Sequence, residues 1–290
     1  MSAAALPVAM IGLGRMGGPM ADCAIRAGHD VRVFDVSSDA MAPRAAAGAR
    51  ACRSVAEACD GARIVSVVVF DDDQVLDVVA GAGGVLASVA PGAVVVIHTT
   101  VTLDTIEELA VAAAERGVQL LDAGISGGES GAAAGTLVVM VGGDGHALEL
   151  ARPVLETYAR EIVHAGAQGS GMALKLARNM VGYIMMSAAH EALRLATAGG
   201  VDGETLRHVL EATDLPAMLY TPFGLGGPAP LADDAPPEVR AAMEHVVRTG
   251  RKDLRQAITL ADRHGIPVPA ALVARDELAE VMRLDHHPAD

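Results

Sequence analysis

Val8-Ala9-Met10-Ile11-Gly12-Leu13-Gly14-Arg15-Met16-Gly17 decides the fold of this chain, because a short apolar run leads directly into three glycines spaced as G-x-G-x-x-G. Such a run before a glycine turn is typical of a buried parallel strand. A helical pattern follows to about Ala27, and Gly28 then turns the chain into a second apolar run, 31–34, which ends on Asp35. The sequence therefore predicts a strand, a glycine turn, a helix and a second strand.

A glycine turn at this place suits the pyrophosphate of a dinucleotide, because the missing side chains let backbone N–H groups approach it at a helix N-terminus. The motif alone is a weak signal, but the flanking strand and helix, with an acid 18 residues past the last glycine, make it specific. Asp35 can accept hydrogen bonds from both ribose hydroxyls and would repel a 2′-phosphate. We therefore expect NAD, with NADP as the alternative because Ser37 and Ser38 leave room for it. A glycine turn that binds nothing is the other interpretation.

Five more apolar runs predict further strands at 64–70, 94–97, 118–121, 137–141 and 162–163, with helical stretches between them. Alternating strands and helices favour a Rossmann domain, an α/β fold with a doubly wound parallel sheet. Ligands of such sheets bind beyond the carboxyl ends of the strands. Phe70 and Thr100 lie at such ends, as does the stretch 122–128.

Asp122-Ala123-Gly124-Ile125-Ser126-Gly127-Gly128 is a second glycine-rich stretch after a predicted strand. The Ser126 hydroxyl and the backbone amides of Gly127 and Gly128 are the kind of convergent donors that a carboxylate needs. An ordinary β-turn is the alternative interpretation.

A long helix is predicted over residues 169–198, where Ala, Leu and Met dominate and Gly199-Gly200 supplies the stop. Roughly thirty residues at ~1.5 Å each give about 45 Å, enough for an interdomain helix. Lys175 and Asn179 stand four residues apart and therefore share a face. Because a lysine on a largely apolar face needs a reason, Lys175 is the candidate catalytic group.

Residues after about 200 carry no strand signal and predict an all-α domain, with helices near 203–212, 237–247, 250–264 and 270–283 and a long loop at 213–237. Arg251 and Lys252 would then open a helix. Cations near a helix N-terminus are unfavourable, so they face either an anion or solvent. We expect two domains, 1–167 for the dinucleotide and 168–290 for the substrate and subunit contacts.

Composition narrows the functional classes. The 290 residues carry a net charge of −14, which argues against nucleic acid. No apolar run is long enough to cross a membrane and no signal peptide opens the chain, so we expect a cytoplasmic protein. Cys23, Cys52 and Cys59 have no metal-ligand spacing, and the acids at 71–73 suit a helix N-terminus better than a metal. We expect no metal, and we interpret His98 as structural.

Four motifs occur in order along the chain. They are Ile11 to Gly17 with Pro19-Met20; 122–128 with Gly135-Thr136-Leu137 and Met140-Val141-Gly142-Gly143; Gly169-Ser170-Gly171 with Lys175 and Asn179; and Lys252-Asp253-Leu254. Together they resemble the β-hydroxyacid dehydrogenase family, of which 3-hydroxyisobutyrate dehydrogenase is the best-known member. Gly124 departs from the family's usual proline, as do Phe70 and Leu103, and these changes bear on the substrate more than on the reaction class.

The resemblance implies a role for each group of residues. Lys175 would be the general acid/base, and a small anionic hydroxy acid would be held by Ser126, Gly127, Gly128, Asn179 and Lys252. The residues implied in cofactor binding are Gly12, Leu13, Gly14, Arg15, Met16, Gly17, Asp35, Val69, Phe70, Thr100 and Lys252.

The expected reaction is the NAD(P)-dependent interconversion of a small 3-hydroxy acid and its semialdehyde or keto acid, with hydride transfer to the nicotinamide while Lys175 takes the hydroxyl proton. One alternative is a reductase of small semialdehydes or imines, although imine reductases generally lack the helix lysine. The other is a protein that binds NAD without turnover. Apolar helices in the second domain predict a homodimer or homotetramer.

Overall fold

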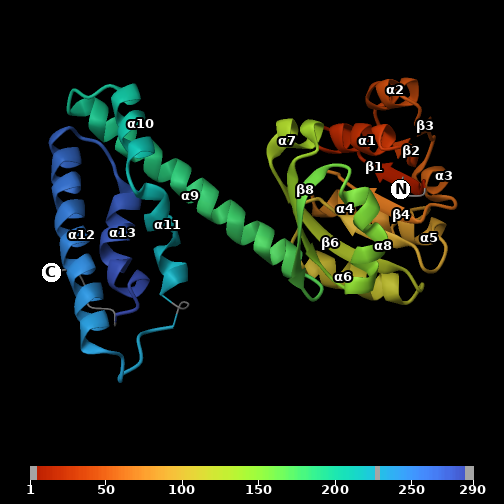
Figure 1. The fold of residues 1–290 in the computed structure, drawn as a ribbon. Coiled ribbons are helices and arrows are strands. Elements are labelled where there is room, and N and C mark those ends of the chain that lie inside the picture. The colour runs from red at the N-terminus through yellow and green to blue at the C-terminus, as the bar shows by residue number, and fades with distance from the viewer. Residues whose placement is uncertain (1–4, 226–228, 285–290) are drawn as a thin grey trace. The chain divides into compact units, whose positions relative to one another are not determined.

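The computed structural model describes residues 5–225 and 229–284 of the chain (Figure 1). Contacts divide the chain into two compact units, Met1–Asn179 and Met180–Asp290. The division falls inside α9 (Ser170–Ala198), the long helix that the sequence predicts. The first unit is α/β and the second is all-helical, which confirms the expected fold class.

An eight-stranded sheet forms the first unit, in the order β3-β2-β1-β4-β5-β6-β7-β8. Its strands are β1 (Pro7–Ile11), β2 (Asp30–Phe34), β3 (Arg50–Ala51), β4 (Ile64–Val67), β5 (Val94–Ile97), β6 (Gln119–Ser126), β7 (Leu137–Gly142) and β8 (Ala159–Gly166). The strand order reverses between β1 and β4, and such a switch point is where doubly wound sheets bind their ligands.

The sheet differs from the expected one in three places. The two-residue strand β3 was missed, and the last two strands run the other way, since β7 is antiparallel to β6 and β8 is parallel to β7. The short helix α7 (Gly128–Ala134) joins β6 to β7, and a connection of this length does not return the chain for a parallel crossover. β6 also continues to Ser126, because Ser126 pairs with Val138; most of the predicted loop at 122–128 is therefore strand.

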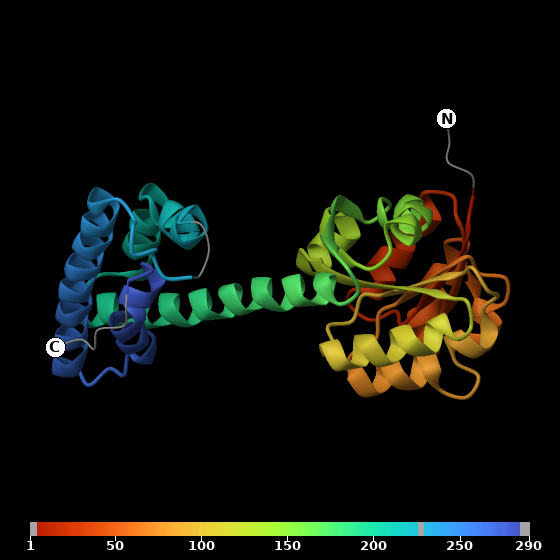
Figure 2. The same ribbon diagram turned by 90° about the horizontal axis from the view of Figure 1, so that it is seen from below.

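Helices cover both faces of the sheet (Figure 2). One core joins the sheet to α1 (Gly17–Arg26) and α8 (Gly145–Leu155), and the other joins it to α3 (Val55–Cys59), α4 (Asp72–Ala80), α5 (Val85–Ser88) and α6 (Leu103–Ala114). The helix α2 (Ser38–Ala46) follows β2. In β6, Leu121, Ala123 and Ile125 belong to the first core, so residues 122, 124 and 126 point to the opposite face, as strand alternation requires.

The second unit contains the end of α9 with α10 (Gly203–Ala212), α11 (Leu215–Gly224), α12 (Pro237–Arg263) and α13 (Pro269–Val281). Two sequence predictions were wrong here. Part of the loop expected at 213–237 is α11, whose proline in the first turn removes no helical hydrogen bond; residues 226–228 of that loop lie outside the described part. The two helices expected at 237–247 and 250–264 are one helix, in which Gly250 lets α13 approach: a Cβ there would stand 2.6 Å from Leu278 Cδ2.

A side-chain cap ties two helices of this unit together. The carboxylate of Glu191 on α9 accepts hydrogen bonds from the backbone N–H groups of Ala270 (2.9 Å) and Ala271 (3.2 Å) at the start of α13. Such a cap satisfies donors that the helix itself leaves open. Within the described residues, no helix is both long enough and apolar enough to cross a bilayer.

Candidate active site

The three glycines of the first motif lie between β1 and α1 and have different reasons to be glycine. A Cβ at Gly12, whose φ is +88°, would overlap the Val68 carbonyl oxygen, and one at Gly17 would overlap the Gly12 carbonyl oxygen. Gly14 has no atom of the protein within 4 Å of such a Cβ. The first and last glycines are thus required by the packing of the chain, while the middle one leaves open space above the turn, which a pyrophosphate could fill.

Asp35 lies at the carboxyl end of β2 and holds the glycine turn. Its Oδ2 accepts a hydrogen bond from the Leu13 N–H at 2.7 Å, and its Oδ1 accepts one from the Ser37 N–H at 2.8 Å. Each carboxylate oxygen has a second lone pair. Asp35 can therefore fix the turn and still accept a hydrogen bond from a ribose hydroxyl.

The other predicted cofactor residues lie around the same strand ends. Val69 exchanges two 3.0 Å hydrogen bonds with the Thr99 hydroxyl, so Thr99 joins the ends of β4 and β5 while its neighbour Thr100 is exposed. Phe70 is 84% exposed. Arg15 pairs with Glu129 at 2.9 Å, which connects the glycine turn to the start of α7. Met16 is half-buried beside the core.

The beginning of α9 is fixed by Asp122, a residue to which the sequence analysis gave no role. Its fully buried carboxylate accepts hydrogen bonds from the N–H groups of Gly169 and Met172, both at 2.7 Å, and from the Gln168 amide at 3.2 Å. A Cβ at Gly171 would stand 2.5 Å from the Gly142 nitrogen. The helix thus packs directly against strand backbone, and its first turns have one defined position.

Lys175 lies one turn further along α9, with only 9% of its surface exposed. Its Nζ donates a hydrogen bond to the Ile125 carbonyl oxygen at 2.6 Å. Burial lowers the pKa of Lys175, and the positive charge of Arg178 lowers it further. The amine therefore loses its proton more readily than a lysine in water, which suits a general acid/base.

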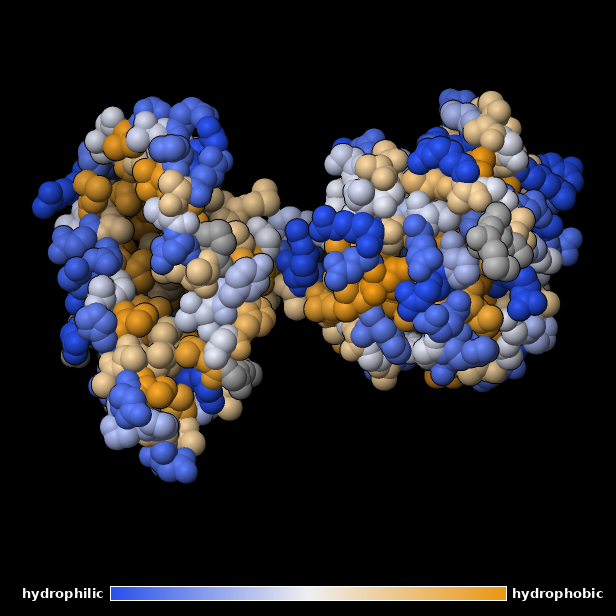
Figure 3. Space-filling view, viewed as in Figure 1, coloured by the Kyte–Doolittle hydropathy of each residue, from blue (hydrophilic) through white to orange (hydrophobic). Residues whose placement is uncertain are grey.

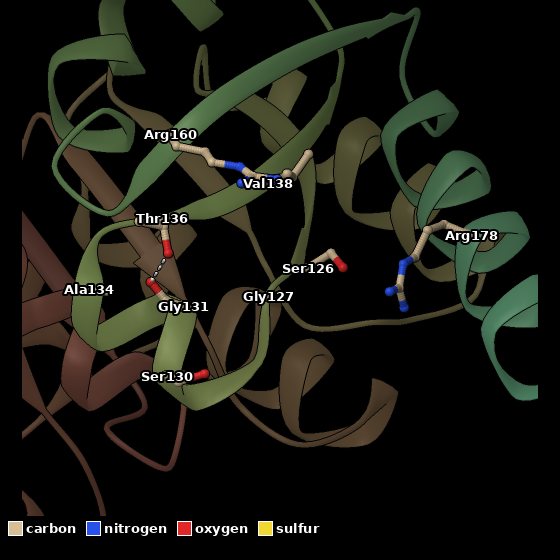
Figure 4. Close-up of a pocket in the computed structure, with 9 residues that line it drawn as sticks. All are labelled: Ser126, Gly127, Ser130, Gly131, Ala134, Thr136, Val138, Arg160 and Arg178. Atoms are coloured by element: carbon tan, nitrogen blue, oxygen red, sulfur yellow. Dashed lines mark hydrogen bonds between the residues drawn. The ribbon is translucent and has the colours of Figure 1, made fainter. Parts of the chain in front are cut away.

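Ser126 and Gly127, which directly follow the Ile125 carbonyl that Lys175 binds, line a pocket of about 530 Å³ (Figure 4). Gly127 and Gly128 have φ of 137° and 66°, a region that favours glycine. Their N–H groups and the Ser126 hydroxyl have no hydrogen-bond partner within the described residues, so all three remain available to an anion. Asn179 is half-buried, and its side-chain oxygen accepts a 3.4 Å hydrogen bond from Arg178, which also lines the pocket.

Lys252 does not open a helix, so that expectation was wrong. It lies in the middle of α12, in the second unit, and its Nζ is 2.9 Å from the Asp253 carboxylate. The argument from a cation at a helix N-terminus therefore fails, and the local ion pair accounts for the charge.

His98 and the acids at 71–73, for which the sequence left a second interpretation open, have local structural roles. His98 is buried, with Nδ1 2.8 Å from the Ala123 carbonyl oxygen and Nε2 3.1 Å from the Tyr158 hydroxyl, and burial lowers its pKa to about 4. Asp71 caps α4, and Asp72 accepts hydrogen bonds from Thr102 and Thr105. Across residues 5–225 and 229–284, no group of three or more His, Cys, Asp or Glu could hold a metal ion.

Two family models match this chain. Residues 7–166 match the model described as the NAD binding domain of 6-phosphogluconate dehydrogenase, and residues 169–290 match one described as NAD-binding of NADP-dependent 3-hydroxyisobutyrate dehydrogenase. These matches confirm the expected cofactor, NAD with NADP as the alternative.

Three relatives show how far the similarity extends. The 3-hydroxyisobutyrate dehydrogenase of Pseudomonas aeruginosa is 36% identical, over 93% of this chain and 90% of its own length. The NAD-dependent L-serine dehydrogenase of the same organism is 40% identical, over 70% of this chain and 68% of its own. The structure of Mycobacterium tuberculosis 3-hydroxyisobutyrate dehydrogenase with L-serine superposes with a TM-score of 0.69 at 32% identity, covering 99% and 96% of the two chains.

Proposed function

Because the chain belongs to the β-hydroxyacid dehydrogenase family, we propose that it is an NAD-dependent dehydrogenase that oxidises a small 3-hydroxy acid to the corresponding semialdehyde or keto acid. The observation that carries this proposal is the buried Lys175 amine, whose pKa is lowered and which lies beside unpaired donors at Ser126, Gly127 and Gly128. An oxidation of this kind needs both a base and a carboxylate site.

The glycine turn and Asp35 fit an NAD molecule. The open space above Gly14 suits the pyrophosphate, and the Asp35 carboxylate suits the adenine ribose. A 2′-phosphate would meet the negative charge of Asp35, and the nearby Arg44 is already paired with Asp22 at 2.8 Å. We therefore propose NAD in preference to NADP. The proposed cofactor residues are Gly12, Leu13, Gly14, Arg15, Met16, Gly17, Asp35, Val69, Phe70, Thr100 and Lys252.

Lys175 has the proton-transfer role in the proposed reaction. Bound NAD supplies the acceptor for the hydride that leaves the hydroxyl carbon. The neutral amine of Lys175 takes the hydroxyl proton and becomes an ammonium ion, and in the reverse direction that ion returns the proton to the carbonyl oxygen. Ser126, Gly127, Gly128 and Asn179 orient the substrate, and Lys252 is a further proposed substrate residue.

The lysine separates the proposal from two of the three alternatives. A reductase of semialdehydes uses the same amine as an acid, so the two functions share a site and differ in direction. A reductase of imines or a protein that binds NAD without turnover gives no reason for a buried lysine with a lowered pKa.

A panel of hydroxy acids, assayed with NAD and NADP in parallel by absorbance of the reduced nicotinamide, tests the proposal. We expect turnover of at least one 3-hydroxy acid, faster with NAD. Lys175→Ala should lower kcat by about 10²–10⁴-fold while the Kd for NAD changes little, because general acid/base catalysis contributes about this much. Near-normal kcat in that variant, or no turnover with any member of the panel, would contradict it.

We also propose that residues 1–167 bind the dinucleotide, that residues 168–290 serve substrate binding and subunit contacts, and that the protein works in the cytoplasm as a homodimer or homotetramer. The helical unit carries apolar side chains at its surface (Figure 3), among them Tyr183, Ile184 and Met186 on α9 and Tyr220 and Phe223 on α11. Surfaces of this kind commonly lie against another subunit. Light scattering that reports a monomer at micromolar concentration would contradict the oligomer.

A further inference from the structure

The pocket beside Lys175 is lined by two arginines and no acid. Its lining residues are Ser126, Gly127, Ser130, Gly131, Ala134, Thr136, Val138, Arg160 and Arg178. Acidic residues outnumber basic ones by 36 to 22 over the whole chain, so a pocket with two positive charges and no negative one departs from the average surface. Such local charge attracts an anion against the overall field of the protein.

Arg160 reaches the pocket because of an irregularity in the sheet. β7 and β8 pair Leu137 with Ala159 and then Val138 with Glu161, so Arg160 is the extra residue of a β-bulge. Bulges re-aim a side chain and occur preferentially beside functional sites. Among the described residues, no hydrogen bond or ion pair occupies the Arg160 guanidinium.

Arg178 approaches the same pocket from the other side. It lies on α9, three residues after Lys175, and it faces β6 near Ser126 just as Lys175 faces Gly124. Figure 4 shows the side chains of Arg160 and Arg178 extending into the pocket from opposite sides, with Ser126 between them. In the described part of the chain, the one hydrogen-bond partner of Arg178 is the Asn179 side-chain oxygen, at a long 3.4 Å. The hydroxyls of Ser126 and Ser130 add neutral donors around the two charges, whereas the Thr136 hydroxyl donates to the Gly131 carbonyl oxygen at 3.5 Å.

We propose that this pocket binds a second anionic group of the substrate, so that the enzyme prefers hydroxy acids with an additional carboxylate or phosphate. The inference rests on the proposed function and narrows its substrate class. Guanidinium groups recognise both anions with paired N–H donors. One carboxylate of the substrate binds at Gly127 and Gly128, and the second anion extends between Arg160 and Arg178.

Kinetics with matched substrates test the preference. We would compare 3-hydroxybutyrate with 3-hydroxyglutarate, and with the 4-phosphate ester of 3,4-dihydroxybutyrate, in the wild type, Arg160→Gln and Arg152→Gln. Arg152 on α8 pairs with Glu149 and lies outside the pocket, so its variant controls for the loss of one charge. A hydrogen bond to a charged group contributes about 1.5–3 kcal/mol, so Arg160→Gln should lower kcat/KM about tenfold or more for the dianionic substrates. The monoanionic substrate should change less than twofold.

The two dianionic substrates identify which anion the pocket takes. Equal effects of Arg160→Gln on monoanionic and dianionic substrates, or no effect on either, would overturn the proposal while leaving the dehydrogenase function in place.

A binding measurement keeps the pocket testable if none of these compounds is oxidised. Calorimetric titration of the NAD-bound enzyme with malonate, and separately with inorganic phosphate, should give saturable binding that weakens about tenfold in Arg160→Gln and is unchanged in Arg152→Gln. Absence of saturable binding for both probes, or equal affinity in wild type and Arg160→Gln, would overturn the proposal. Failure of the proposed function would instead appear as no turnover with intact anion binding.

Discussion

The side chain of Lys175 lies against the α-carbon of Gly124. A Cβ at position 124 would stand 2.5 Å from the Lys175 Cβ and 2.8 Å from its Cγ, closer than carbon atoms approach in folded proteins. The absent side chain therefore lets the lysine stem lie on β6, from which its Nζ reaches the Ile125 carbonyl oxygen at 2.6 Å. The packing of the lysine stem therefore requires glycine at position 124 of this chain.

Gly124→Ala should displace the amine and lower kcat. A misplacement of about 1 Å can reduce turnover by as much as 10²-fold, so we expect a loss of at least tenfold. The Kd for NAD should stay within twofold, because the glycine turn is unaffected. Gly145→Ala is the matched control, since a Cβ there meets only His164 at an ordinary 3.7 Å. Equal kcat in the two variants would show that Gly124 does not position Lys175.

Much of the dinucleotide half could be predicted from sequence, because its determinants are local. The strand, the glycine turn and Asp35 lie within one β-α-β unit, and their spacing alone places them together. Lys175 could be identified because a charged residue stands out on an apolar helix face. The missed direction of β7 is also a local matter, since the connection after Ser126 is too short for a crossover.

Other parts of the site could not be predicted because they depend on contacts between distant residues. Asp122 meets the start of α9 across 46 to 50 residues of chain, and no periodicity reveals such a cap. Arg160 reaches the pocket only through a bulge, which one sequence does not disclose. Lys252 was misplaced because Gly250 suggested a helix boundary, whereas α13 packs against that glycine.

Asp122→Asn should destabilise the first unit and slow the enzyme. An amide keeps one acceptor oxygen and turns its NH₂ toward a backbone N–H, so at least one buried hydrogen bond is lost. Hydrogen bonds to charged groups are worth about 1.5–3 kcal/mol, and we expect a loss of about 2–3 kcal/mol in urea unfolding. Asp144→Asn keeps a capping oxygen at the exposed start of α8 and should lose less than half of that. Equal losses in the two variants would contradict the special role of the buried cap.

His98 should make the stability of the protein depend on pH. Its folded pKa of about 4 lies below the usual 6.5, so between these values the unfolded state binds more protons than the folded state. The contribution of His98 to the free energy of unfolding is therefore complete above pH 6.5. It is lost as the pH falls toward 4, by about 3 kcal/mol in total. The free energy of unfolding of His98→Gln should vary less over this range than that of the wild type, and exposed His146→Gln should behave as the wild type. Parallel curves for all three proteins would contradict the prediction.

Arg178→Gln should shift the pH profile of the reaction to higher pH. Burial is the larger cause of the lowered pKa of Lys175 and the charge of Arg178 is the second, so removing that charge raises the pKa. Oxidation needs the neutral amine, and its rate rises with pH through this pKa; reduction needs the ammonium form, and its rate falls through the same pKa. Both midpoints should therefore move upward together.

Measuring both directions separates this effect from weaker substrate binding. Loss of a substrate contact at Arg178 scales kcat/KM without moving its midpoint, whereas a change in the Lys175 pKa moves the midpoints of oxidation and reduction in the same sense. Arg152→Gln, which removes a distant charge of the same sign, should leave both midpoints in place. Midpoints that stay fixed or move downward in Arg178→Gln would contradict the assignment of the titration to Lys175, because loss of the neighbouring positive charge should raise the pKa of that amine.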